Sequence, residues 1–218
     1  MKKYALLIIL ILAGLTGCKK DKTSDKVNSD GLTEEIVNLV PESVLNEIES
    51  MGMPIYGGEN PPDIENSYLA SPFVLKATNI ENDYSIGYVF ADYYVKFYDQ
   101  DNNNLSVSMD YINGPENGSG YGGYIVGSDN KFSAFFEVSA HLNGTDAKLV
   151  HIISGELETN GIKDLYFANF MLDNYGNTTG YWIENGDGRV IYDSDGFSPV
   201  TDSFKSIKMP GVKSVGAK

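Results

Sequence analysis

The feature that most constrains the fold of this chain is a two-residue alternation of apolar and polar side chains. Residues 105–111 (LSVSMDY) show it most clearly, and residues 89–97 repeat it. Such a pattern predicts strands with one apolar and one polar face. Turn-forming residues recur at short intervals, at 99–104, 113–119, 128–130, 143–144, 160–161 and 173–177. Strands spaced in this way, with no helical pattern between them, favour consecutive antiparallel hairpins.

Two Asn-Gly pairs predict the register of the central strands. A two-residue turn at Asn143-Gly144 places Phe136 opposite His151, and a similar turn at Asn160-Gly161 places His151 opposite Phe170. In these registers one continuous apolar face contains Phe132, Ala134, Phe136, Val138, Leu149, His151, Ile153, Ala168 and Phe170. Further short strands are predicted at 178–183 and 189–192.

About eight strands between residues 67 and 197 predict an all-β domain, with an up-and-down barrel favoured and a sandwich as the alternative. A closed barrel has no unpaired edge strand, which is why we favour it. Gly180-Tyr181-Trp182 resembles the Gly-x-Trp of lipocalins, although in that family the motif lies on the first strand. The resemblance implies a lipocalin-like barrel architecture.

One stretch before the strands has helical character. Residues 33–51 begin with Thr33, a good helix cap, and are followed by Gly52, a good helix stop. Pro41 interrupts this stretch, so we expect two short helices that meet at the proline. Residues 53–66 are rich in glycine and proline, and they predict a loop that leads from the helices to the sheet.

The N-terminus carries a compact sorting pattern. Two lysines precede an apolar run (ALLIILILA), and Leu15-Thr16-Gly17-Cys18 follows. The run from residue 4 to residue 17 is too short for a membrane-spanning helix, which needs roughly 20 residues. Cys18 is the only cysteine in 218 residues, so no disulfide framework within the chain is possible.

This pattern resembles the signal peptide and lipobox of bacterial lipoproteins. The resemblance implies cleavage before Cys18, acylation of its sulfur and a membrane anchor at the new N-terminus. Lys19 follows the cysteine where an aspartate would signal inner-membrane retention, so we expect the outer membrane of a Gram-negative envelope. Whether the protein faces the periplasm or the cell exterior is left open.

The chain divides into a signal peptide (1–17), an acylated tether (18–31), a helical and loop segment (32–66), the β-barrel (67–197) and a tail (198–218). We count residues 32–197 as one domain. They hold 6 Lys and Arg against 26 Asp and Glu. An acidic body of this kind repels phosphate backbones, so a nucleic-acid partner is not expected.

Histidine and tyrosine supply the candidate binding residues. His151 falls between Phe136 and Phe170 on the predicted apolar face, whereas His141, the second histidine, falls on the opposite face. A polar group among aromatic rings can orient a ligand in a cavity, and a hydrogen-bonded core histidine is the alternative. Tyr88, Tyr94 and Tyr98 lie on one predicted strand face, where a row of rings could bind a glycan or a protein partner.

Carboxylates supply the candidate metal ligands. Asp187, Asp193 and Asp195 could converge on Ca²⁺ if the segments that carry them pair, and residues 99–103 begin like an EF-hand loop without its glycine. No nucleophile elbow or phosphate-binding loop is present in the sequence. We therefore expect a non-catalytic, lipid-anchored envelope protein that binds a small apolar ligand or a glycan. The alternatives are a structural subunit that docks onto another envelope protein and, third, a metal-dependent hydrolase.

Overall fold

The computed structural model describes residues 26–205 except 115, 143–144 and 179. The lipobox, Cys18, most of the tether and most of the tail therefore lie outside the described residues. Within them no helix is long and apolar enough to cross a membrane.

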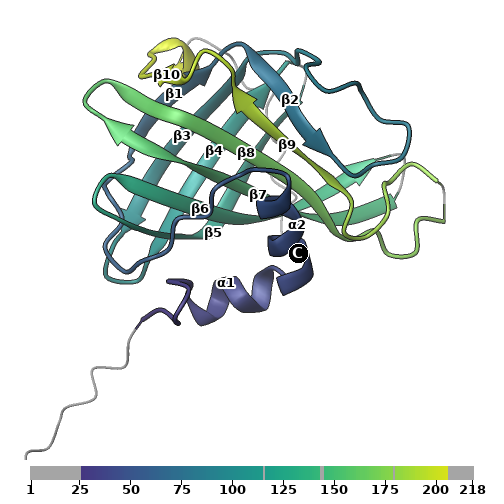
Figure 1. Ribbon diagram of the computed structural model, residues 1–218, viewed down its shortest axis with the longest axis horizontal. Helices are drawn as coiled ribbons and strands as arrows, with labels where there is room; N and C mark the ends of the chain where they lie inside the picture. Colours follow the sequence, from purple (N-terminus) through teal and green to yellow (C-terminus); the bar gives the residue numbers. More distant parts are fainter. Residues whose placement is uncertain (1–25, 115, 143–144, 179, 206–218) are drawn as a thin grey trace, which may run out of the picture.

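Ten strands form one antiparallel sheet (Figure 1). They are β1 (Asn66–Ala70), β2 (Phe73–Thr78), β3 (Tyr93–Asp101), β4 (Ser106–Asn113), β5 (Glu116–Ser128), β6 (Lys131–Leu142), β7 (Thr145–Glu158), β8 (Gly161–Asp173), β9 (Gly188–Asp193) and β10 (Phe197–Pro199). The sheet order is β1-β3-β4-β5-β6-β7-β8-β9-β2, and β10 pairs with β8. Apart from the first pair, strands from β3 to β9 are neighbours in sequence and in space, which confirms the predicted succession of hairpins.

The sheet curls into a nearly closed barrel because β1 and β2 form two halves of one bent strand. On one side of β2, Leu75 N–H donates to the Tyr88 carbonyl oxygen (2.8 Å), so the segment that leads into β3 runs along the edge of β2. On the other side β9 pairs with β2, and Thr201 N–H donates to the Ser67 carbonyl oxygen of β1 (2.8 Å). These contacts leave little free edge, and the predicted barrel is confirmed.

Two short helices cover the outside of the barrel beneath the central strands (Figure 1). They are α1 (Glu34–Leu39) and α2 (Glu42–Ser50), and Pro41 separates them as predicted. Thr33 caps α1, since its Oγ1 accepts from the N–H of Ile36 (3.3 Å). After α2 the chain returns across the wall, where the Tyr56 N–H donates to Ser133 Oγ of β6 (2.8 Å).

The core has an inner and an outer part. The inner cluster fills the barrel and includes Phe97, Phe132, Phe136 and Phe167. The outer cluster lies between the helices and the wall formed by β5 to β9; its wall residues are Val126, Phe135, Val150, Ile152, Ala168, Phe170 and Val190. Strands β7 and β8 are consequently buried on both faces over much of their length.

One of the two predicted registers is confirmed. Phe136 pairs with His151 and Val138 with Leu149, as expected for the β6–β7 hairpin. The register places His141 opposite Asp146, but residues 143–144 and the His141 side chain lie outside what is described, so the turn geometry and the face of this histidine stay predictions.

The predicted register of the β7–β8 hairpin is wrong. Glu158 pairs with Gly161, so the turn is made by residues 159–160, and His151 pairs with Asn169 instead of Phe170. Gly161 belongs to β8 because β10 lies directly against it. A Cβ there would lie 2.5 Å from the Ser198 carbonyl oxygen, so this glycine permits a close strand approach and does not form the turn.

The register change separates the predicted apolar face into two. The side chains of Phe170 and Ala168 point out of the barrel toward the helices, whereas His151 lies inside the barrel against Phe167. The predicted strand at 178–183 is also wrong: this segment is part of a loop between β8 and β9.

Candidate ligand-binding cavity

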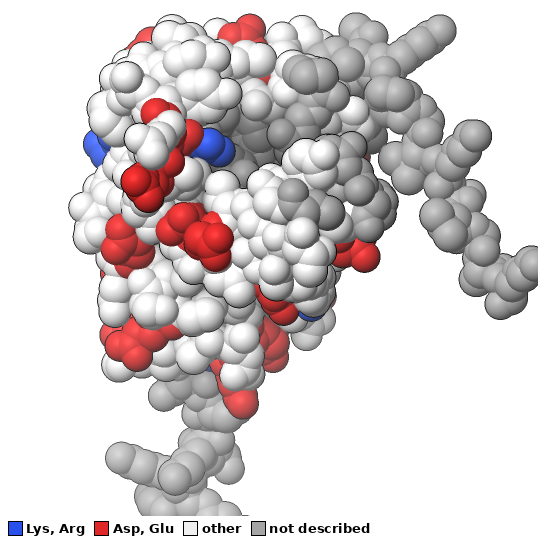
Figure 2. Space-filling model, turned by 90° about the vertical axis from the view of Figure 1, so that its right-hand side faces the viewer, with Lys and Arg blue, Asp and Glu red and all other residues white. Residues whose placement is uncertain are grey.

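A cavity of about 540 Å³ opens at the end of the barrel where β8 leads into β9. Figure 2 looks onto this end and shows a hollowed surface with Asp and Glu side chains and a basic side chain along one side. Its lining comes from strands β4 to β9 and from the loop that follows β8. The volume lies within the range of small-molecule sites in proteins.

The floor of the cavity consists of packed aromatic side chains. His151 contacts both Tyr111 and Phe167, with ring centroids 5.2 Å apart for Tyr111 and His151 and 5.0 Å apart for His151 and Phe167. Phe136 lies deeper, and its ring packs directly over Gly123 of β5, where a Cβ would lie 2.2 Å from the ring. The glycines of β5 therefore let aromatic rings lie flat against the barrel wall.

A row of polar residues crosses the wall just above this floor. His151 of β7 pairs with Asn169 of β8, and Asn169 pairs with Arg189 of β9. Directly paired residues point to the same face of a sheet, so all three side chains face the cavity, and all three line it. His151 Nδ1 and Asn169 Oδ1 are buried and have no hydrogen-bond partner among the described residues.

Burial sets the charge state of the histidine. His151 is only 2% exposed, and the loss of hydration lowers its pKa to about 3. The imidazole is therefore neutral near pH 7. In this state one ring nitrogen donates and the other accepts a hydrogen bond.

Arg189 is neutralised by an ion pair. Its Nε and Nη2 donate to the two carboxylate oxygens of Asp83, at 2.7 and 2.5 Å, and Thr78 Oγ1 donates to the same carboxylate at 2.7 Å. Burial opposes ionisation of Asp83, but the hydrogen bonds from Arg189 and Thr78 outweigh it and lower the pKa of Asp83. The guanidinium also lies 5.5 Å from the centre of the Tyr84 ring.

A cover loop, residues 174–187 with residue 179 outside the description, contributes Tyr181, Trp182 and Ile183 to the lining of the cavity. Trp182 and Ile183 pack against a small cluster of Ala147, Leu149 and Met171 at the ends of β7 and β8. The Trp182 Nε1–H donates to Thr145 Oγ1 (3.1 Å). The Gly186 N–H also donates to the Met171 carbonyl oxygen of β8 (2.9 Å). The loop is thus attached to the barrel by hydrogen bonds and by apolar contacts.

Asparagine side chains hold the cover loop in shape. Asn177 Nδ2 donates to the Trp182 carbonyl oxygen (2.6 Å), and the Trp182 N–H donates to Asn177 Oδ1 (3.0 Å). Asn79 joins the loop to the chain after β2, since its Nδ2 donates to the Gly186 carbonyl oxygen (3.1 Å). The fold of its own loop therefore holds the indole in the lining of the cavity.

The structure brings only some of the predicted ligand-binding residues together. His151 lines the cavity and Phe136 supports its floor, whereas Phe170 lies outside the barrel. Tyr88 stacks on Tyr84 with ring centroids 4.2 Å apart, in a loop that is separate from the tyrosine row predicted with Tyr94 and Tyr98.

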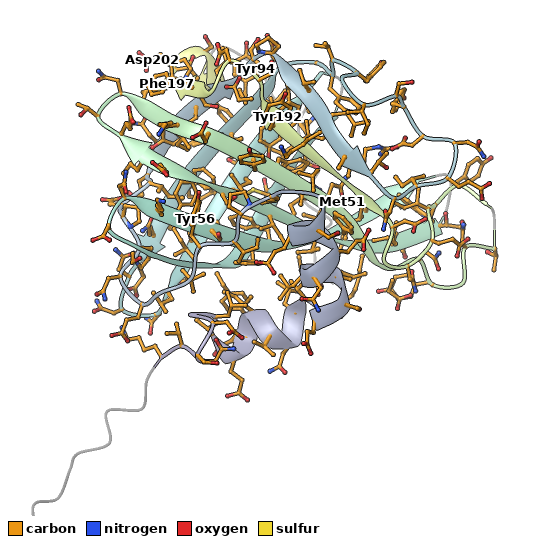
Figure 3. All side chains as sticks on the ribbon, in the orientation of Figure 1. Met51, Tyr56, Tyr94, Tyr192, Phe197 and Asp202 are labelled. Atoms are coloured by element: carbon orange, nitrogen blue, oxygen red, sulfur yellow. The ribbon has the colours of Figure 1, made fainter. Side chains whose placement is uncertain are left out.

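The two remaining tyrosines lie on the outer face of β3. Figure 3 shows Tyr94 at the edge of the barrel remote from Met51 and the helices. The Tyr98 hydroxyl donates to Asp110 Oδ1 (3.3 Å), and Lys96 Nζ lies 5.1 Å from the centre of the Tyr98 ring. Neither tyrosine approaches the cavity.

Sequence reasoning missed three of the residues that shape the site. Asn169 is a lone polar residue in the run LYFANFML, Arg189 is the only arginine of the chain, and Trp182 is the only tryptophan. Each of these residues is unusual in the sequence and could have been singled out. Only the strand register and the course of the cover loop, however, bring them close to His151.

The predicted calcium ligands lie at different places. Asp187 precedes β9 and Asp193 ends it, so the length of β9 separates them. Asp193 is 1% exposed, and its Oδ2 accepts from Ser198 Oγ (2.6 Å). Burial and the neighbouring Asp195 raise the pKa of Asp193 to about 6. Among the described residues no group of three or more His, Cys, Asp or Glu could hold a metal ion.

The EF-hand-like segment forms an ordinary turn. Asp101 Oδ1 accepts from the Asn103 N–H (2.8 Å), and Asp101 Oδ2 accepts from Asn104 Nδ2 (2.7 Å). The carboxylate thus binds the turn that follows it.

A second hollow, of about 520 Å³, lies outside the barrel beside α1 and α2. Its lining includes the carboxylates Asp30, Glu42 and Glu49 and none of the buried side chains without a hydrogen-bond partner. The cavity in the barrel is therefore the stronger candidate.

Comparisons of the chain with protein-family models, with curated proteins and with solved structures found no match.

Proposed function

We propose that this protein is a lipid-anchored envelope protein that binds a small, largely apolar ligand non-covalently inside its barrel. The observation that carries the proposal is the cavity of about 540 Å³ into which two buried polar atoms point without a partner. Buried polar groups are normally hydrogen-bonded in folded proteins. A bound ligand would supply the missing partners.

Binding fits this site better than acid–base catalysis. A general base needs a pKa near the working pH, whereas burial lowers the pKa of His151 to about 3. The imidazole is also enclosed by Tyr111 and Phe167. It can orient a ligand but is a poor proton acceptor.

The cavity also supports an apolar ligand over a glycan on the outer tyrosines. Leu149, Met171 and Trp182 give the cavity apolar walls, which suit a hydrophobic body. The Tyr98 ring on the outer face is already covered on one side by Lys96.

Native mass spectrometry of the chain that begins at Lys19, expressed without the signal, tests the proposal. We expect a co-purified small molecule or a captured lipid adduct that is lost on denaturation. Val138→Trp, which fills the cavity, should abolish the adduct, and Val37→Trp on the exposed face of α1 should not. A wild-type chain that retains no adduct from lipid mixtures would argue against ligand binding.

The anchor is proposed on the lipobox alone. Cys18→Ala should prevent acylation and move the protein from the membrane fraction to the soluble fraction, while the circular dichroism of the β domain stays unchanged. Retention of the variant in membranes would contradict the lipid anchor.

A docking subunit is the second candidate, and one observation favours it. Four exposed apolar side chains gather in the loop between β2 and β3, namely Tyr84, Ile86, Tyr88 and Val89, with 44 to 64% of each exposed. Exposed apolar patches of this kind often bind a partner protein. The double variant Ile86→Ser with Val89→Ser should then release an identified envelope partner without affecting ligand binding. Val200→Ser, the control, should not release that partner.

A further inference from the structure

We infer that the ligand carries one uncharged hydroxyl group, which binds His151 and Asn169 in the depth of the cavity, and an apolar body that extends toward Trp182. This inference rests on the proposed ligand-binding function and specifies the chemistry and the orientation of the ligand.

The hydroxyl follows from the two buried atoms without a partner. His151 Nδ1 and Asn169 Oδ1 belong to directly paired residues, so both face the same part of the cavity. A hydroxyl both donates and accepts, whereas a carbonyl or an ether only accepts. It can donate its one hydrogen to the Asn169 amide oxygen and accept from His151 Nδ1–H, in the tautomer that carries the proton on Nδ1.

The absence of a free charge at the site excludes an ionic head group. The described lining residues include no Asp, Glu or Lys, and Arg189 is their only charged side chain. Asp83 already takes the Arg189 guanidinium in two hydrogen bonds, and His151 is buried among aromatic rings. A carboxylate or an ammonium group would therefore lose its hydration without gaining a counter-ion.

The position of the polar row gives the orientation. Below it the packed rings of Phe136 and Phe167 close the barrel. Above it Leu149, Met171 and Trp182 form an apolar passage to the mouth. A ligand that enters with its hydroxyl first can bind the polar row while its body fills this passage. The opposite orientation would leave His151 Nδ1 and Asn169 Oδ1 without hydrogen-bond partners.

A panel of four probes with the same hydrocarbon chain tests this inference: decanol, decanoate, decylammonium and decyl methyl ether, each below its solubility limit or critical micelle concentration. Trp182 is the only tryptophan and lines the cavity, so its fluorescence reports binding, with native mass spectrometry as the second readout. We expect decanol to bind at least tenfold more tightly than either ion and more tightly than the ether.

Variants of His151 and Asn169 show whether these two residues bind the head group of the probe. Asn169→Leu should weaken decanol binding about tenfold and leave the ether unchanged, because an ether has no hydrogen to donate to Asn169 Oδ1. His151→Phe should weaken decanol binding about tenfold and weaken the ether as well, because either oxygen can accept from Nδ1–H. Val37→Ser, on the outer surface, is the matched control. Circular dichroism verifies folding, and if both variants fail to fold, the ranking of the four probes on the wild-type chain decides alone.

The outcomes separate this inference from the proposed function. Equal binding of all four probes, or tighter binding of decanoate, would overturn the hydroxyl inference while ligand binding stands. Binding of none of them, with no fluorescence change and no adduct mass, would overturn both.

Discussion

The burial of His151 predicts a stability that falls steeply in acid. The unfolded histidine titrates near its ordinary pKa of 6.5, whereas burial lowers the folded value to about 3. Between these values the unfolded chain binds a proton that the folded chain excludes. Stability is therefore complete above about pH 6.5 and is lost as the pH falls toward 3.

The size of the effect follows from the two pKa values. Each pH unit below 6.5 costs a little over 1 kcal/mol, so the folded state loses about 1 kcal/mol by about pH 5.5 and about 3 kcal/mol by about pH 4.5. The imidazole is nearly fully buried, so solvent screening reduces these free energies only slightly.

Replacing the histidine isolates its contribution. His151→Phe keeps a ring between Tyr111 and Phe167 and removes the titrating group. Urea unfolding of both chains at about pH 8, 6.5, 5.5 and 4.5 gives the difference in unfolding free energy at each pH. We expect the unfolding free energy of the variant, relative to that of the wild-type chain, to rise by about 3 kcal/mol between the first and last condition. A difference that stays constant with pH would refute the account of a neutral, desolvated imidazole.

Three further predictions concern other parts of the fold. Asp193→Asn should stabilise the protein above about pH 6 by about 1–3 kcal/mol, and the pH dependence of stability is opposite to that caused by His151. The reason is that a raised carboxyl pKa favours folding at low pH, and this gain is lost as the pH rises from 3.8 to about 6. Thermal melts at about pH 5 and 8 measure the effect, and equal melting shifts at both would contradict it. Gly123→Ala should lower the melting temperature, since its Cβ would lie 2.2 Å from the Phe136 ring, and Phe136→Leu should recover part of the loss; no recovery would mean that another contact is responsible. Asp83→Ala should leave the Arg189 charge free and raise the affinity for decanoate about tenfold in the Trp182 fluorescence assay, and an unchanged affinity would show that Arg189 does not face the ligand.

Local sequence patterns were sufficient for much of the fold. The alternation at 105–111 places Val107, Met109 and Tyr111 on the buried inner face of β4. Pro41 separates the two helices where its missing N–H requires. Alternation and proline stereochemistry act over a few residues, so both can be read without knowledge of the remaining chain.

The β7–β8 register could not be read in the same way. Residues 149–153 (LVHII) are apolar on both faces because the barrel interior covers one face and the helices cover the other. The hydrophobic pattern then no longer distinguishes one register from the next. The decisive contact, β10 against Gly161, joins segments more than 30 residues apart.

The candidate site shows the same division. His151 could be identified because a single histidine in an apolar strand is conspicuous, but its neighbours Asn169 and Arg189 depend on two strand pairings. Tyr94 and Tyr98 were grouped with Tyr88 as one row. The strand begins only at Tyr93, however, and the preceding segment follows the edge of β2.

The sequence by itself determined most of the strands, the paired helices and the acidic composition, and it carries the prediction of a lipid anchor, because each depends on residues close together in the chain. Only the tertiary structure decided which faces of β7 and β8 point inward, how the barrel closes, and that Trp182 lines the same cavity as His151 and Asn169. These features depend on contacts between distant segments, whose free energy is gained only when the barrel closes and the helices pack against its wall.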